Sequence, residues 1–65
     1  MSSSDIDSIG YDSQSGVLEV EFTTGDMYQY FNVPEHLHNG LMNAASKGQF
    51  LNDYIKFSYR YQKVS

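Results

Sequence analysis

Hydrophobic positions alternate in the first half of the chain and follow a helical period in the second half. The clearest strand is Leu18-Glu19-Val20-Glu21-Phe22, where alternation places three apolar side chains on one face and both glutamates on the other. An earlier strand is predicted over residues 6–11, with Gly10 as a bulge, and a central third strand over residues 27–33. Turn-forming residues at 12–16 and 23–26 separate these strands, and residues 1–5 are expected to be frayed.

Two short helices are predicted after the strands. Pro34 is expected at the first helical position, where its missing N–H is not needed, and apolar residues follow at helical spacing. Gly40 weakens this helix and is expected to permit a close approach to the sheet. Ser46 followed three residues later by Gln49 is typical of a capping box, which predicts a second helix start.

The C-terminal segment changes period once more. Phe57, Tyr59 and Tyr61 alternate with polar residues, a pattern that fits either a fourth strand or an extended tail. The predicted fold is α+β: an antiparallel three-stranded meander, two short helices packed on one face, and a C-terminal strand or extended tail. The helices should cover the apolar face of the 18–22 strand. The expected core members are Phe22, Tyr30, Phe50, Tyr54 and Ile55.

Length and composition limit the class of protein. The chain has 65 residues, is 40% hydrophobic and contains no cysteine, so one small domain over residues 1–65 must be stabilised by its side-chain core. This size excludes a two-domain enzyme and a dinucleotide-binding fold. No basic or apolar leader and no long apolar segment is present, which favours a cytoplasmic location without membrane contact.

Charge is distributed unevenly along the chain. Residues 1–35 carry a formal charge of −7 and residues 36–65 carry +3, within a total of −4. One interpretation is that an acidic half folds against a basic half. The other is that the basic half offers a face to an anionic partner.

The order of these motifs resembles the KTSC domain family, a short domain named for its occurrence at the C-terminus of some lysyl-tRNA synthetases and also found in stand-alone bacterial and phage proteins. The matching motifs run over nearly the whole chain: Ile9-Gly10-Tyr11, Leu18 to Phe22, Gly25, Tyr28-Gln29-Tyr30, Val33-Pro34, Ala45 to Gly48, Phe50-Leu51-Asn52, Ile55 and Tyr59. Many members have proline where this chain has Arg60. Because some members are fused to lysyl-tRNA synthetases, the resemblance implies RNA binding. Tyr28 and Tyr30 correspond to the family's characteristic Tyr-x-Tyr.

Three groups of residues are candidate sites. Tyr28 and Tyr30 share a strand face, so they could form a stacking platform for bases, although packing in the core is the simpler interpretation. Ser46, Lys47 and Gly48 could bind an anion at a helix start, or Ser46 could only cap its helix. The third group interleaves cations with aromatics, which fits either nucleic-acid binding or a protected edge strand. Its members are Lys47, Lys56, Tyr59, Arg60, Tyr61 and Lys63.

Catalytic and metal sites are not predicted. Glu19 and Glu21 alternate with core residues and should face solvent, so neither is expected in a cleft that would suit acid–base catalysis. His36 and His38 are two apart on a predicted helix and point in different directions, so they cannot share a metal. The expected function is a non-catalytic binding module without cofactor or metal, and the family resemblance favours RNA or single-stranded nucleic acid as its ligand. The alternative is a protein–protein adaptor or regulator.

Overall fold

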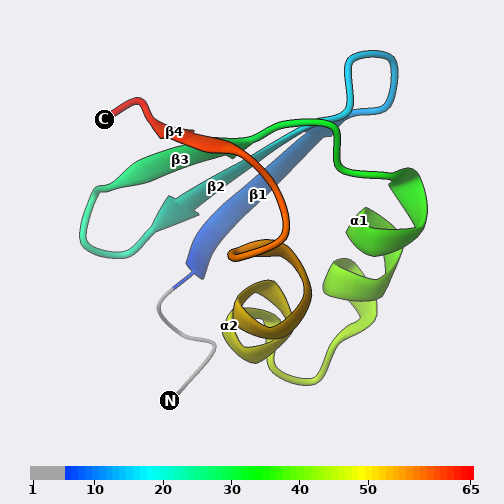
Figure 1. Cartoon of the computed structure of the whole chain (residues 1–65). Helices are drawn as coiled ribbons and strands as arrows, with labels where there is room; N and C mark the ends of the chain where they lie inside the picture. The colour runs from blue at the N-terminus through cyan, green and yellow to red at the C-terminus, as the bar shows by residue number, and fades with distance from the viewer. Residues whose placement is uncertain (1–5) are drawn as a thin grey trace.

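A computed structural model of the chain describes residues 6–65. Four antiparallel strands form one sheet in the order β1-β2-β3-β4. The strands are β1 (Ile6–Asp12), β2 (Val17–Phe22), β3 (Met27–Tyr30) and β4 (Tyr61–Lys63). Helices α1 (Glu35–Asn43) and α2 (Lys47–Phe50) lie together on one side of the sheet, as predicted (Figure 1).

The first two hairpins follow the predicted turn chemistry. Asp12 Oδ1 accepts a hydrogen bond from the Gln14 N–H at 3.0 Å, and Gly16 closes the turn at φ 76°. The carbonyl of Gly16 then accepts from the Val33 N–H at 2.9 Å, which ties this turn to the segment after β3. The predicted bulge at Gly10 is wrong, because the register of β1 shifts between Ile6 and Ser8 while Gly10 pairs regularly with Glu19.

Strand β3 is central, as predicted, but ends earlier than residue 33. Asn32 adopts a positive φ of 59°, which turns the chain out of the sheet towards α1. Residues near the C-terminus pair with β3, so of the two predicted alternatives, a fourth strand or an extended tail, the strand forms. The Val64 N–H extends this pairing by donating to the Met27 carbonyl at 2.8 Å. The sheet therefore consists of the predicted three-stranded meander with β4 added at the edge beside β3.

Helix α1 starts one residue later than predicted. Pro34 occupies the N-cap position with extended backbone, φ −70° and ψ 152°, and Glu35 is the first helical residue. Leu41 is fully buried and Leu37 is half-buried, as the helical spacing predicts. The close approach predicted for Gly40 exists, but its partner is the ring of Phe50 in α2 and not the sheet.

The second helix has the predicted cap. Ser46 Oγ accepts a hydrogen bond from the Gln49 N–H at 3.4 Å, whereas the Gln49 side chain binds Asp53, so only half of the capping box forms. After α2 the chain continues as η2 (Leu51–Ile55), a wider π-helical turn in which the Lys56 N–H donates to the Leu51 carbonyl at 2.8 Å.

The core lies between the helices and the sheet. Leu18 and Val20 of β2 face the helices, and Tyr30 lies opposite Leu18 in β3. The buried residues are Leu18, Val20, Tyr30, Val33, Leu41, Leu51 and Ile55. Tyr30 and Ile55 were predicted core members and are confirmed; Phe22 and Phe50 are half-buried and pack against this cluster.

The prediction for Tyr54 is wrong. Its side chain is 54% exposed, although its ring contacts Phe50 at a centroid distance of 4.6 Å. Leu51 and Ile55 of η2 belong to the buried cluster, and Tyr54, between them in the sequence, lies outside it.

Candidate functional site

A groove of about 610 Å³ lies between the helix-covered face of the sheet and the α2–η2 segment. Aromatic residues of the sheet form one wall, and residues of α2 and η2 form the other. The lining residues are Ile6, Phe22, Tyr28, Tyr30, Gly48, Gln49, Leu51, Asn52, Lys56 and Tyr61. Its size falls in the range of about 300–1,000 Å³ that is usual for small-ligand sites.

Three tyrosines and one phenylalanine make the aromatic wall. Tyr61 lies opposite Tyr30 in the β3–β4 register, and its ring centroid is 5.8 Å from the rings of both Tyr28 and Tyr30. Phe22 meets Tyr28 edge-to-face at 5.7 Å. These centroid distances are typical of favourable aromatic pairs, so the wall is a preformed surface.

Exposure differs sharply along this wall. Tyr30 is only 3% exposed and forms part of the core, whereas Tyr61 is 56% exposed. Burial raises the pKa of the Tyr30 phenol, and the neighbouring Tyr28 and Tyr61 phenols raise it further. Tyr30 therefore stays protonated and neutral, and Tyr61 is the ring that a ligand can reach.

The opposite wall carries polar groups at its edge. Gln49 Nε2 donates to both carboxylate oxygens of Asp53 at 3.0 Å, which holds the Gln49 side chain in place. Asn52 and Lys56 are exposed and follow at helical spacing. Among the described residues that line the groove, Lys56 is the only charged one.

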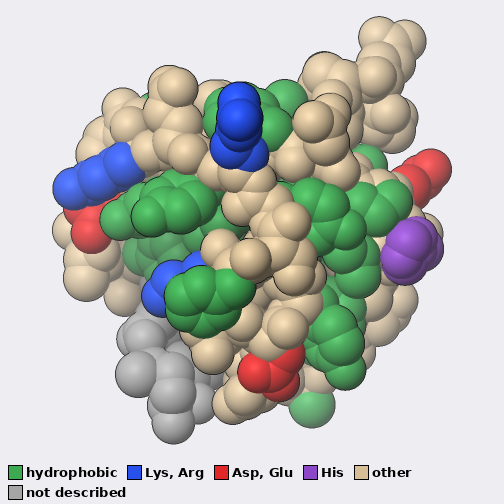
Figure 2. Space-filling model, in the orientation of Figure 1, with side chains coloured by type: hydrophobic (Ala, Val, Ile, Leu, Met, Phe, Trp, Pro, Cys, Tyr) green, Lys and Arg blue, Asp and Glu red, His purple; other side chains and the backbone are tan. Residues whose placement is uncertain are grey.

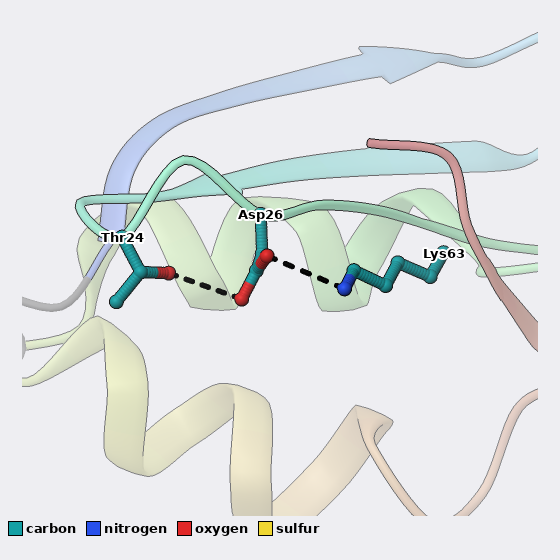
Figure 3. Close-up of polar contacts among 3 residues, drawn as sticks. All are labelled: Thr24, Asp26 and Lys63. Atoms are coloured by element: carbon teal, nitrogen blue, oxygen red, sulfur yellow. Dashed lines mark hydrogen bonds and ion pairs between the residues drawn. The ribbon is translucent and has the colours of Figure 1, made fainter.

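The remaining cations lie outside the groove. Lys63 of β4 forms an ion pair with Asp26, whose second carboxylate oxygen accepts from Thr24 Oγ1 at 3.1 Å (Figure 3). Arg60 is exposed immediately before β4, and its carbonyl accepts from the Phe31 N–H at 2.9 Å. Figure 2 shows Lys and Arg side chains beside hydrophobic side chains on this face of the molecule.

Two comparisons identify the family. The sequence model of the KTSC domain matches residues 2–64 of the chain. A crystal structure of a KTSC domain protein from Yersinia pestis superposes with a TM-score of 0.89 and 44% identity, covering 100% of this chain and 92% of that one. The chain belongs to the KTSC domain family. The resemblance inferred from the motifs is confirmed.

Relatives of this KTSC domain include proteins of very different length. A lysine–tRNA ligase from Nostoc punctiforme is 37% identical over 60 residues, and an uncharacterised protein from Stutzerimonas stutzeri is 38% identical over 65 residues. The second match covers 98% of this chain and 92% of the relative. The chain spans only about a tenth of the lysine–tRNA ligases it matches, with 92% of this chain and 11% of the ligase covered in the first match.

The structure of the KTSC domain brings only some of the predicted site residues together. Gly48, Lys56 and Tyr61 line the groove with Tyr28 and Tyr30. Tyr59 packs against the core cluster, so its ring is not presented with that of Tyr61. Lys47, Arg60 and Lys63 are absent from the groove lining.

The anion site predicted at Ser46, Lys47 and Gly48 has a weak geometric basis. The Ser46 hydroxyl caps the helix, α2 is a single turn of four residues, and Gly48 belongs to the aromatic groove. The capping role is therefore confirmed, and anion binding stays a prediction.

Glu19, Glu21 and His38 each contact another side chain. Glu19 accepts from Gln29 Nε2 at 3.2 Å and Glu21 from Ser8 Oγ at 3.1 Å. His38 stacks on the ring of Tyr11 at 4.6 Å. Within residues 6–65 no three His, Asp or Glu side chains gather as a metal site, and no helix is long and apolar enough to cross a bilayer.

Sequence reasoning missed Gln49 and Asn52 on the polar side of the groove, although it named Lys56. Gln49, Asn52 and Lys56 follow one another at intervals of three and four residues, the spacing of one helix face. That spacing could have grouped the two amides with the lysine. Their position opposite the aromatic wall depends on how α2 and η2 pack on the sheet.

Proposed function

We propose that this KTSC domain is a non-catalytic module that binds single-stranded nucleic acid, with RNA as the favoured ligand. The observation that carries the proposal is the groove, where an accessible tyrosine ring, Tyr61, lies across from a lysine, Lys56. Single-strand binders combine rings on which bases stack with cations that contact phosphates. The match to part of lysine–tRNA ligases, enzymes whose name includes tRNA, supports an RNA ligand.

The small number of cations limits the affinity for RNA and its salt dependence. The chain has four Lys and Arg residues and a net charge of −4, so long-range attraction of a polyanion is small. With at most four phosphate contacts, the slope of log K against log salt should be no steeper than about −3. Affinity should lie in or below the non-specific range, with Kd of about 10⁻⁴–10⁻⁶ M.

The test is a titration of ¹⁵N-labelled protein with an unstructured RNA at low salt, followed by amide shifts. We expect shifts at Gln49, Asn52, Lys56 and Tyr61. Lys56→Gln combined with Arg60→Gln should reduce affinity at least tenfold. The matched control, His36→Asp with Asn39→Asp, changes net charge equally but on exposed positions of α1 outside the groove, and should change affinity far less.

Two results would contradict the proposal. One is the absence of any shift at saturating RNA. The other is a set of shifts confined to the acidic side of the sheet, around Glu19 and Glu21, where no electrostatic argument places RNA.

A protein–protein adaptor is the second candidate, and one observation favours it. Phe57 is 82% exposed beside Lys56, whose ammonium lies 5.6 Å from the ring centroid, and Tyr54 is exposed on the same segment. Exposed aromatic side chains are common at protein interfaces. Pull-down from a bacterial lysate with and without nuclease separates the two candidates, because a protein partner survives nuclease and an RNA-dependent one does not.

A further inference from the structure

We propose that the groove holds one unstacked base of the bound strand and that Gln49 and Asn52 select adenine. This inference rests on the single-strand binding proposed above. It adds a defined subsite and a base preference, which general backbone binding does not require.

The aromatic wall determines how a base can enter. The Tyr28 and Tyr61 rings are 5.8 Å apart and inclined by 49°, and Tyr30 and Tyr61 are equally close. Insertion between two rings needs about 7 Å, twice the stacking spacing of about 3.4 Å. The base therefore stacks on the accessible face of Tyr61 and presents its edge to the α2–η2 wall.

The two amides on that wall supply different hydrogen-bonding groups. The Gln49 NH₂ is engaged by the Asp53 carboxylate, so Gln49 presents its carbonyl oxygen, an acceptor. An acceptor pairs with adenine N6 or cytosine N4, both amino donors, and not with the keto oxygens O4 of uracil and O6 of guanine at the equivalent positions. Asn52 is exposed and carries both a donor and an acceptor, which match adenine N7 and N6 as a pair.

The charge of the groove completes the subsite. Lys56 is exposed beside Asn52 at helical spacing, and no carboxylate is among the described lining residues. Its ammonium can contact the phosphate of the nucleotide whose base stacks on Tyr61. The groove of about 610 Å³ thus offers Tyr61 for stacking of the base, two amides for its edge and Lys56 for the phosphate.

The experiment compares 5′-labelled RNA octamers of A, C and U by fluorescence anisotropy at low salt. We expect the A octamer to bind about tenfold more tightly than the U octamer, with the C octamer between them. Asn52→Ala should lower affinity for the A octamer to that for the C octamer, because the Gln49 acceptor remains, and should leave U binding unchanged. Asn39→Ala, an exposed asparagine of α1 outside the groove, is the matched control and should keep the preference.

A second readout uses adenosine monophosphate and the side-chain NH₂ signals of Asn52 and Gln49, which should shift on titration while those of Asn39 stay in place. Equal affinity for the three octamers, or a preference for A over C that survives Asn52→Ala, overturns the base selection while leaving single-strand binding intact. Failure of every octamer to bind overturns both proposals.

Discussion

Gly40 of α1 lies directly against the ring of Phe50 in α2. A Cβ atom at position 40 would lie 2.7 Å from Phe50 Cζ, closer than Cβ atoms approach other atoms in folded proteins, and 3.1 Å from Cε2, which is tighter than most such contacts. Glycine inside a helix costs about 1 kcal/mol relative to alanine. The contact explains why α1 tolerates that cost, because Phe50 packs against the core and also precedes η2.

Gly40→Ala is expected to lower the free energy of unfolding by about 1 kcal/mol, since overpacking of about 1–3 kcal/mol exceeds the gain in helix propensity. In a Phe50→Leu background the same change should be neutral or stabilising, because the ring atoms that clash are gone. Urea denaturation of the four proteins in this double-mutant cycle measures the effect. A stabilising Gly40→Ala in the parent chain would show that the contact does not limit position 40.

Two adjacent residues of η2 should respond very differently to truncation. Ile55 is fully buried, and Ile55→Ala should cost about 2–5 kcal/mol, enough to unfold most of a domain this small. Tyr54 is 54% exposed, so Tyr54→Ala should cost about 1 kcal/mol or less. Circular dichroism and thermal melting compare them, and equal losses would place Tyr54 in the core after all.

Ser46→Ala should lower stability by about 1 kcal/mol through loss of the cap to the Gln49 N–H. Ser46→Asp should be neutral or better, because a carboxylate also caps the helix and suits its positive end. Phosphate binding should respond to Ser46→Asp in the opposite way, because the new carboxylate would repel the anion. If Ser46→Asp abolishes amide shifts of Lys47 and Gly48 with phosphate, the segment binds anions; no shift in the parent leaves capping alone.

Alkaline pH should destabilise the fold through Tyr30. The raised pKa of its phenol means that this side chain stays protonated in the folded state after the unfolded phenol, with a pKa of about 10, has ionised. The contribution is intact below about pH 10 and is lost as pH rises through the folded pKa. In urea denaturation between about pH 8 and 11, the free energy of unfolding of Tyr30→Phe should fall less steeply with pH than that of the parent. The control Tyr54→Phe should follow the parent. Parallel curves for the parent and Tyr30→Phe would contradict this.

Asp26→Asn should strengthen RNA binding a few-fold at low salt, because it frees Lys63 from an ion pair of 3.4 Å. Both side chains are about half exposed, so the stability of the fold should change by less than about 1 kcal/mol. Glu35→Gln changes net charge equally at an exposed position of α1 and serves as control. An equal gain in both variants would attribute the effect to net charge alone.

The local patterns of the sequence determined most of the elements. Alternation defined β2, glycine and aspartate chemistry defined the two hairpin turns, and Ser46 defined the start of α2. These features depend on interactions between residues close in the sequence, so the sequence alone predicts them. The order of the motifs was also enough to identify the family.

Tertiary packing decided what the chain could not specify locally. A three-residue strand such as β4 is stable only because β3 offers it a partner, so the same tail fits a strand or a coil until the sheet is present. Tyr54 and Ile55 both fit the apolar helical pattern, and the packing of η2 on the core buries Ile55 and leaves Tyr54 exposed. The groove likewise exists only where the aromatic face of β3 and β4 meets Gln49, Asn52 and Lys56, because its two walls come from segments whose relative position is set by long-range packing.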